Sequence, residues 1–117
     1  MQTEPGTLSL VRGGTLALHL AEETYSLTRD DIHTLLFNGQ SVPLTRTEEV
    51  NNPDGAVFVS TVIDGHITVH ASGRAVIAAT RGGLYSIPFA CFRQVTRGEA
   101  ASAPLFPVHP ALAGGFL

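Results

Sequence analysis

The sequence predicts a β-dominated α+β domain: a small pseudo-twofold antiparallel barrel or sandwich made of two ββ(β)αβ repeats, with one or two short helices. Two observations lead to this prediction. Short runs of alternating apolar and polar residues are separated by turns that contain glycine, as in antiparallel sheets. The order of these runs then recurs further along the chain, and this recurrence indicates an internal repeat.

The first half of the chain begins with three predicted strands. Residues 7–11 and 15–20 alternate on either side of Gly13 and Gly14, which indicates a β-hairpin. Residues 25–27 form the third strand. Their apolar positions lie on one face, so we expect a sheet that is buried on one side only.

A short helix is predicted after these strands. Thr28 suits the N-cap because its hydroxyl can accept a hydrogen bond from a free backbone N–H. Asp30 and Asp31 suit the positive end of the helix dipole. Gly39 can adopt the left-handed conformation that ends a helix. Residues 40–46 then return to strand character.

The second half follows a polar segment, residues 45–55, which is predicted to be a linker turn. Asp64 and Gly65 stand between two strand-like runs and predict a tight hairpin turn. The elements expected around and after it are strands at 56–63, 66–71, 75–80 and 84–87, a helical turn at 89–97, and an apolar tail rich in Pro, Ala and Gly at 103–117.

The two halves align when Tyr25 is set on Tyr85, and the aligned repeats cover approximately residues 6–44 and 65–105. Each repeat leaves an apolar face that it cannot bury alone, so the two copies are expected to pack against each other. Chance similarity between strand–turn–strand patterns is the alternative explanation.

Composition predicts one domain across residues 1–117. The chain is 44% hydrophobic and 15% charged, a balance typical of a packed globule rather than a disordered chain. The net charge is -3, and the basic residues are all arginines: Arg12, Arg29, Arg46, Arg74, Arg81, Arg93 and Arg97. Because they are scattered along the sequence, we expect no nucleic-acid partner.

The same sequence predicts a cytoplasmic protein with no membrane partner. No apolar run approaches the ~20 residues that a membrane-spanning helix needs, and the first residues lack the pattern of a signal peptide. Cys91 is the single cysteine, so an internal disulfide is excluded. Its apolar neighbours Ala90 and Phe92 predict a buried structural thiol.

The histidines raise the question of a metal site; they are His19, His33, His66, His70 and His109. His66 and His70 lie four residues apart in a predicted strand and point the same way. Four residues of strand span about 13 Å, whereas donor atoms lie ~2 Å from a bound metal ion. This pair cannot chelate a metal without other partners, so we expect no metal and a solvated face.

No catalytic arrangement is predicted. Asp30, Asp31 and His33 stand at a helix start, but capping and the helix dipole account for both carboxylates, and no nucleophile stands beside His33. The glycines lie in turns and form no phosphate-binding motif, so no cofactor is expected.

The leading hypothesis is a non-enzymatic binding or assembly module that self-associates through its apolar tail or its sheet edges, either as a homo-oligomer or with a protein partner. The alternative is a small-molecule or metal-dependent binding protein or enzyme with a cleft between the two repeats. Equivalent tyrosines suggest such a cleft, and the candidate ligand-binding residues are Tyr25, Tyr85, His66 and His70.

Overall fold

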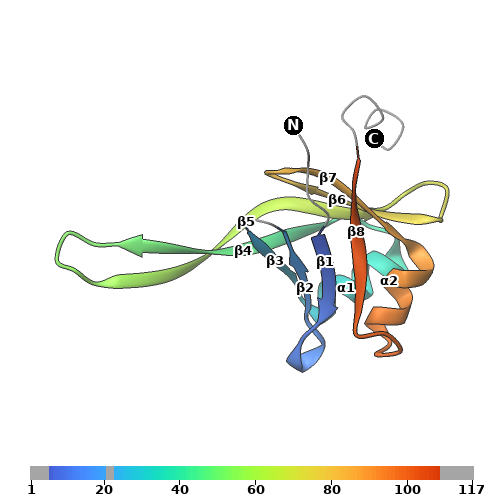
Figure 1. Cartoon of the computed structure of the whole chain (residues 1–117), viewed down its shortest axis with the longest axis horizontal. Helices are drawn as coiled ribbons and strands as arrows, with labels where there is room; N and C mark the ends of the chain where they lie inside the picture. The colour runs from blue at the N-terminus through green and yellow to red at the C-terminus, as the bar shows by residue number, and fades with distance from the viewer. Residues whose placement is uncertain (1–5, 21–22, 109–117) are drawn as a thin grey trace.

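The structure, a computed structural model, describes residues 6–20 and 23–108 (Figure 1). Its elements in chain order are β1 (Gly6–Leu10), the short 3-10 helix η1 (Arg12–Gly14), β2 (Leu16–His19), β3 (Thr24–Leu27), α1 (Arg29–Asn38), β4 (Val42–Asn51), β5 (Val57–Val69), β6 (Ala75–Thr80), β7 (Gly83–Pro88), α2 (Phe89–Thr96) and β8 (Ser102–Val108).

The eight strands form one closed antiparallel barrel. Each strand pairs with the next along the chain, and β8 pairs with β1 to close the sheet, with Ala103 opposite Leu8. The prediction of a mainly β fold with short helices is therefore confirmed, and of the two architectures the sequence allowed, the barrel is the one that forms.

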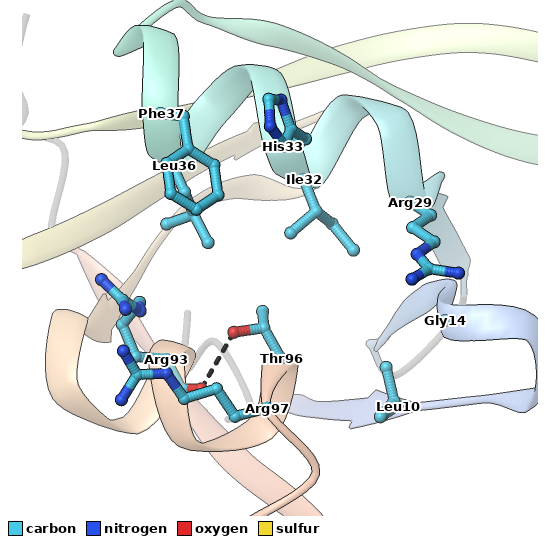
Figure 2. Close-up of a pocket in the computed structure, with 10 residues that line it drawn as sticks. All are labelled: Leu10, Gly14, Arg29, Ile32, His33, Leu36, Phe37, Arg93, Thr96 and Arg97. Carbon is cyan, nitrogen blue, oxygen red and sulfur yellow. Dashed lines mark hydrogen bonds between the residues drawn. The ribbon is translucent and has the colours of Figure 1, made fainter.

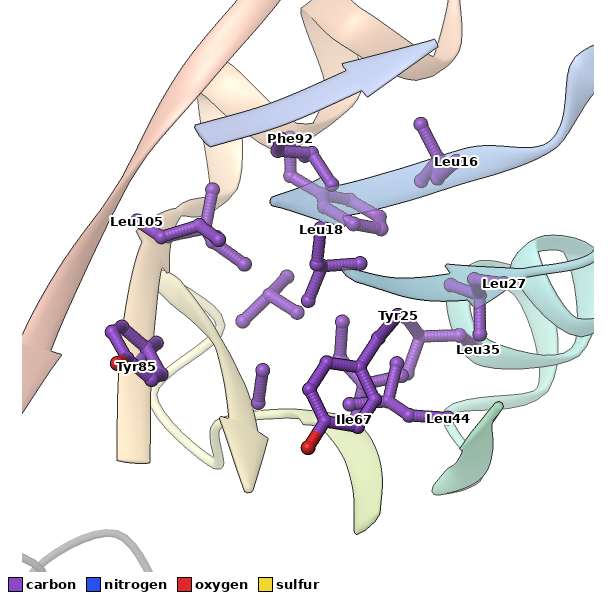
Figure 3. Close-up of a cluster of buried hydrophobic side chains, with 14 of the residues drawn as sticks. Leu16, Leu18, Tyr25, Leu27, Leu35, Leu44, Ile67, Tyr85, Phe92 and Leu105 are labelled. Carbon is purple, nitrogen blue, oxygen red and sulfur yellow. The ribbon is translucent and has the colours of Figure 1, made fainter. Parts of the chain in front are cut away.

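The core fills the inside of the barrel, where the alternating pattern places the apolar residues. Leu8, Leu18 and Ile67 are fully buried there, and their neighbours in the sequence face outward because successive side chains of a strand alternate. Figure 3 shows Tyr25 and Tyr85 at one side of this core and Phe92 at the other.

Both helices close the same end of the barrel, since α1 connects β3 to β4 and α2 connects β7 to β8 (Figure 1). The start of α1 agrees with the prediction, because the Thr28 hydroxyl accepts a hydrogen bond from the Asp31 N–H at 3.1 Å. Gly39 ends the helix with a φ of 66°. The buried side chains of Ile32 and Phe92 attach the two helices to the core.

The element order β-β-β-α-β occurs twice along the chain, and the strand register is equivalent in the two halves. In the first half Leu18 pairs with Tyr25, and in the second half Ala78 pairs with Tyr85. The glycines that open each half also correspond. A Cβ at Gly6 would lie 2.7 Å from the carbonyl oxygen of His19, and one at Gly65 would collide with the carbonyl oxygen of Ala79.

The prediction of a hairpin turn at Asp64 and Gly65 is wrong. Both residues lie inside the single long strand β5, at a register shift in its pairing with β4. Gly65 has a φ of 102°, which suits glycine at a β-bulge. The polar segment 45–55 is likewise more than a linker, because β4 continues through it to Asn51.

Beyond the barrel, β4 and β5 form a long two-stranded ribbon, residues 47–63, which we call the arm. Pairing of β4 with β3 stops at Arg46, and pairing of β5 with β6 begins only at His66. The two strands of the arm are therefore paired with each other alone across the part of the chain that the structure describes. Figure 1 shows the arm extending sideways from the barrel.

The segment predicted as a tail begins as a barrel strand. Residues 103–108 belong to β8, in which Ala103 and Leu105 are buried in the core. The rest of that segment, residues 109–117, lies outside the described residues. Within the described ranges, neither helix is long and apolar enough to cross a membrane.

Candidate functional site

The two predicted tyrosines are inside the barrel. Tyr25 is fully buried and Tyr85 is 5% exposed. Burial, together with the hydrogen bond that the Tyr25 hydroxyl donates to the Glu23 carboxylate, raises the pKa of Tyr25 to about 12. Burial also raises the pKa of Tyr85. Both phenols thus stay protonated in the folded protein across the neutral range.

The predicted histidines lie elsewhere. His66 is exposed in β5, where it pairs with Ala79. His70 follows the end of β5, and its Nδ1 lies 2.8 Å from the Ser72 hydroxyl oxygen. The four predicted residues are thus divided between the barrel interior, its outer face and a turn. Their role in ligand binding stays a prediction.

Cys91 is half-buried and packs against the core. Within residues 6–20 and 23–108, no group of three or more His, Cys, Asp or Glu side chains is arranged to hold a metal ion.

A network of charged side chains surrounds the Tyr25 hydroxyl at the base of the arm. Arg46 donates from Nε to Asp64 at 2.7 Å and contacts Glu48 through Nη1 at 3.1 Å. Arg81 reaches the same Asp64 carboxylate at 3.3 Å and Glu23 at 3.7 Å. The hydrogen bond to Asp64 raises the pKa of Arg46.

The side chain of Arg46 is only 10% exposed, so this network differs from a solvated surface pair. Its members come from the segment before β3, from β4, from β5 and from the turn after β6. The network therefore connects the base of the arm to two other parts of this end of the barrel, the segment before β3 and the turn after β6.

The arm itself carries apolar side chains in solvent. Val57, Val59 and Ile63 are 59%, 68% and 72% exposed. They share one face, because they stand at alternate positions of β5, and their cross-strand partners on β4 are Asn51, Glu49 and Thr45. The sequence showed these residues as part of an ordinary strand. Their exposure follows from the continuation of β4 past Arg46, which carries both strands away from the core.

A second surface feature lies between the two helices. A groove of about 350 Å³, which we call the interhelix groove, is lined by Leu10, Gly14, Arg29, Ile32, His33, Leu36, Phe37, Arg93, Thr96 and Arg97 (Figure 2). In the sequence, the three arginines of this groove stand at positions 29, 93 and 97 among others that are scattered along the chain. No local pattern in the sequence indicates that these arginines line one groove, because α1 and α2 are far apart along the chain.

The chain was compared with models of protein families, with curated proteins and with solved structures, and nothing in any of the three comparisons matches it.

Proposed function

We propose that this protein is a non-enzymatic assembly module that pairs with a second copy of itself through the arm. The observation that supports the proposal is a protruding two-stranded ribbon with open edges and an exposed apolar face. Unpaired strand edges expose rows of backbone N–H and C=O groups, and they are a common template for pairing with another chain. An isolated two-stranded ribbon is also marginally stable in water, so the arm gains from added strands.

The edge formed by β5 suits self-pairing better than the edge formed by β4. Residues 57–63 of β5 carry no charge and contain no Pro or Gly, and five of the seven are β-branched. Such a segment has high strand propensity. The β4 side of the arm carries Glu48 and Glu49, and a second copy would place like charges beside them.

Two β5 edges can pair antiparallel around a twofold axis, which makes the interface self-complementary. With the axis at Ser60, Val59 would lie opposite Thr61 of the partner subunit, and the two arms would join into one four-stranded sheet. The exposed valines of both copies would then share one face. Neighbouring side chains on one face of paired strands contribute about 0.2–1 kcal/mol for each pair, in addition to the backbone hydrogen bonds of the new edge.

The apolar tail was the other predicted route to self-association. Its first part is a barrel strand, and its remainder lies outside the described residues. Deleting residues 103–117 would remove β8 and open the barrel, so loss of oligomers in that variant would not distinguish assembly from unfolding. The arm offers a cleaner test, because it lies outside the barrel (Figure 1).

The test is sedimentation velocity over a range of concentrations. We expect the wild-type mass to rise from the 12.3 kDa of one chain to twice that value. Val59→Lys places a charge on the exposed face beside the pairing edge, so this variant should stay monomeric. Thr47→Lys is the matched control, because Thr47 is exposed on the β4 side of the arm, and it should pair as the wild type does.

Far-UV circular dichroism must show that both variants keep the barrel. A wild-type chain that remains monomeric at every concentration contradicts the proposal. A Val59→Lys variant that still forms dimers rules out the β5 edge, as does a Thr47→Lys variant that is monomeric. A mass that continues to rise past the dimer contradicts closed twofold pairing.

A further inference from the structure

The interhelix groove lies where the two halves of the barrel meet, on the side of the molecule away from the arm (Figure 1). One wall comes from α1, which belongs to the first half, and the other comes from α2, which belongs to the second. Its volume of about 350 Å³ is within the range of small-ligand pockets. Any ligand here would contact both halves.

The two walls differ in chemistry although the helices occupy equivalent positions. At the repeat offset, Leu36 and Phe37 of α1 correspond to Thr96, the last residue of α2, and to its C-cap residue Arg97. The α1 wall is therefore apolar where the α2 wall is polar and cationic. Figure 2 shows Ile32 and Leu36 on the wall opposite Arg93 and Arg97. It shows Arg29 beside Gly14, at the end of the groove away from Arg93.

Positive charge is concentrated at this groove. Of the residues that the structure describes, Arg29, Arg93 and Arg97 line it and no carboxylate does, although the net charge of the chain is -3. Among the described residues, no carboxylate lies within 4.0 Å of Arg29 or Arg93. Arg97 meets Glu99 only at 4.0 Å, and both side chains are more than half exposed. Such a pair contributes little and can exchange for a ligand.

The α2 wall holds Arg93 in place from its own helix. Its guanidinium lies 5.9 Å from the centre of the Phe89 ring, a cation–π contact. The neighbouring Thr96 hydroxyl donates to the Arg93 carbonyl at 2.9 Å, and its oxygen still can accept a hydrogen bond. The N–H groups of the guanidinium therefore stay available for a ligand, and a planar carboxylate can accept two of these hydrogen bonds at once.

The geometry points to a binding site for a small organic acid with an apolar body. Its carboxylate would be held by Arg93 and Arg97, and its hydrocarbon would lie against Leu10, Ile32 and Leu36. Arg93 and Arg97 on the α2 side select the acid group, and Ile32 and Leu36 of α1 select the apolar body. Neither an inorganic anion nor an uncharged hydrocarbon satisfies both walls.

Octanoate is the probe, and titration is followed by NMR chemical shifts of the backbone amides. We expect saturable shifts that centre on α1 and α2. Octan-1-ol lacks the charge and inorganic phosphate lacks the apolar body, so each should bind more weakly than octanoate. Replacing both guanidiniums, Arg93→Gln with Arg97→Gln, should weaken octanoate binding by about tenfold or more, as expected for losing hydrogen bonds to a charged group.

Arg74→Gln is the control for loss of a positive charge elsewhere on the surface, to be compared with the single variant Arg93→Gln, because Arg74 is exposed and is not among the residues that line the groove. It should leave octanoate affinity unchanged. Phe37→Ser is a second variant that keeps the fold, since Phe37 is 72% exposed. It removes part of the apolar wall and should weaken octanoate more than phosphate.

The inference is overturned if octanoate gives no shifts around the groove, or if octan-1-ol or phosphate binds as tightly. It is also overturned if the double arginine variant binds octanoate as the wild type does while its circular dichroism spectrum is unchanged. None of these results depends on whether the arm forms a dimer, so the two proposals fail or stand separately.

Discussion

Replacing Gly65 by Ala tests the bulge that directs β5 out of the barrel. Gly65 has a φ of 102°, and a Cβ there would collide with the carbonyl oxygen of Ala79. An L-residue in the left-handed region costs about 1–2 kcal/mol, and forcing atoms into a packed site costs roughly 1–3 kcal/mol more. We therefore expect Gly65→Ala to lower the free energy of unfolding by about 2–5 kcal/mol.

Gly73→Ala is the matched control. Gly73 also has a positive φ, of 73°, but no atom lies within 4 Å of the Cβ position. Gly73→Ala should therefore lower the free energy of unfolding only by the cost of the left-handed backbone conformation, about 1–2 kcal/mol. Gly→Ala also restricts the unfolded chain, and because both variants share that effect it cancels from their difference.

The assay is urea unfolding followed by far-UV circular dichroism, because the chain has no Trp. Small domains have unfolding free energies of about 5–15 kcal/mol, so Gly65→Ala should shift the midpoint well below that of Gly73→Ala. If both variants lose the same free energy, contact with the Ala79 carbonyl contributes nothing and our account of the bulge is wrong.

Two further predictions concern Tyr25 and Thr28. Burial and the Glu23 hydrogen bond raise the pKa of Tyr25 from 10.0 to about 12, so its contribution to stability is complete below about pH 10 and is lost as pH rises towards about 12. In the Tyr25→Phe variant, the urea midpoint should therefore decrease less steeply between about pH 10 and pH 12 than it does in the wild type. A spectrophotometric titration in which both tyrosines ionise near pH 10 would contradict the raised pKa of Tyr25. Thr28→Ala should lose about 1 kcal/mol through the N-cap, measured by the same unfolding. Thr34→Ala is its control, and equal losses in the two variants would exclude a capping effect.

Features that depend only on neighbouring residues could be predicted from the sequence. Helix α1 begins after Thr28 and ends before Gly39, as predicted. The reason is local, because the Thr28 hydroxyl accepts a hydrogen bond from a free backbone N–H at the helix start and Gly39 can adopt the left-handed conformation that ends a helix. Alternation at period two placed Leu16 and Leu18 inside the sheet, because successive side chains of a strand face opposite sides.

The same reasoning failed at Asp64 and Gly65, because an Asp-Gly pair fits a tight turn and also a bulge. Local sequence does not distinguish the two. Pairing with β4 decides between them, since β4 continues beyond Arg46 and provides partners for residues 57–63. That pairing is a long-range contact, and it also creates the arm.

The candidate sites show the same division. Alternation and the repeat offset predicted equivalent, strand-borne tyrosines, and both are in the barrel interior. The interhelix groove could not be derived in that way, because Arg29 and Arg93 are far apart in the sequence and line one groove only when the barrel closes.

The alternating strands and the caps of α1 could thus be predicted from the sequence alone, because they depend on periodicity or on neighbouring residues, although the break predicted at Asp64 and Gly65 was wrong. Tertiary structure decided three things: that the sheet closes as a barrel, that β4 and β5 extend into an arm, and that arginines from separate helices line one groove. Each depends on pairing or packing between distant segments, and only the folded chain brings those segments together.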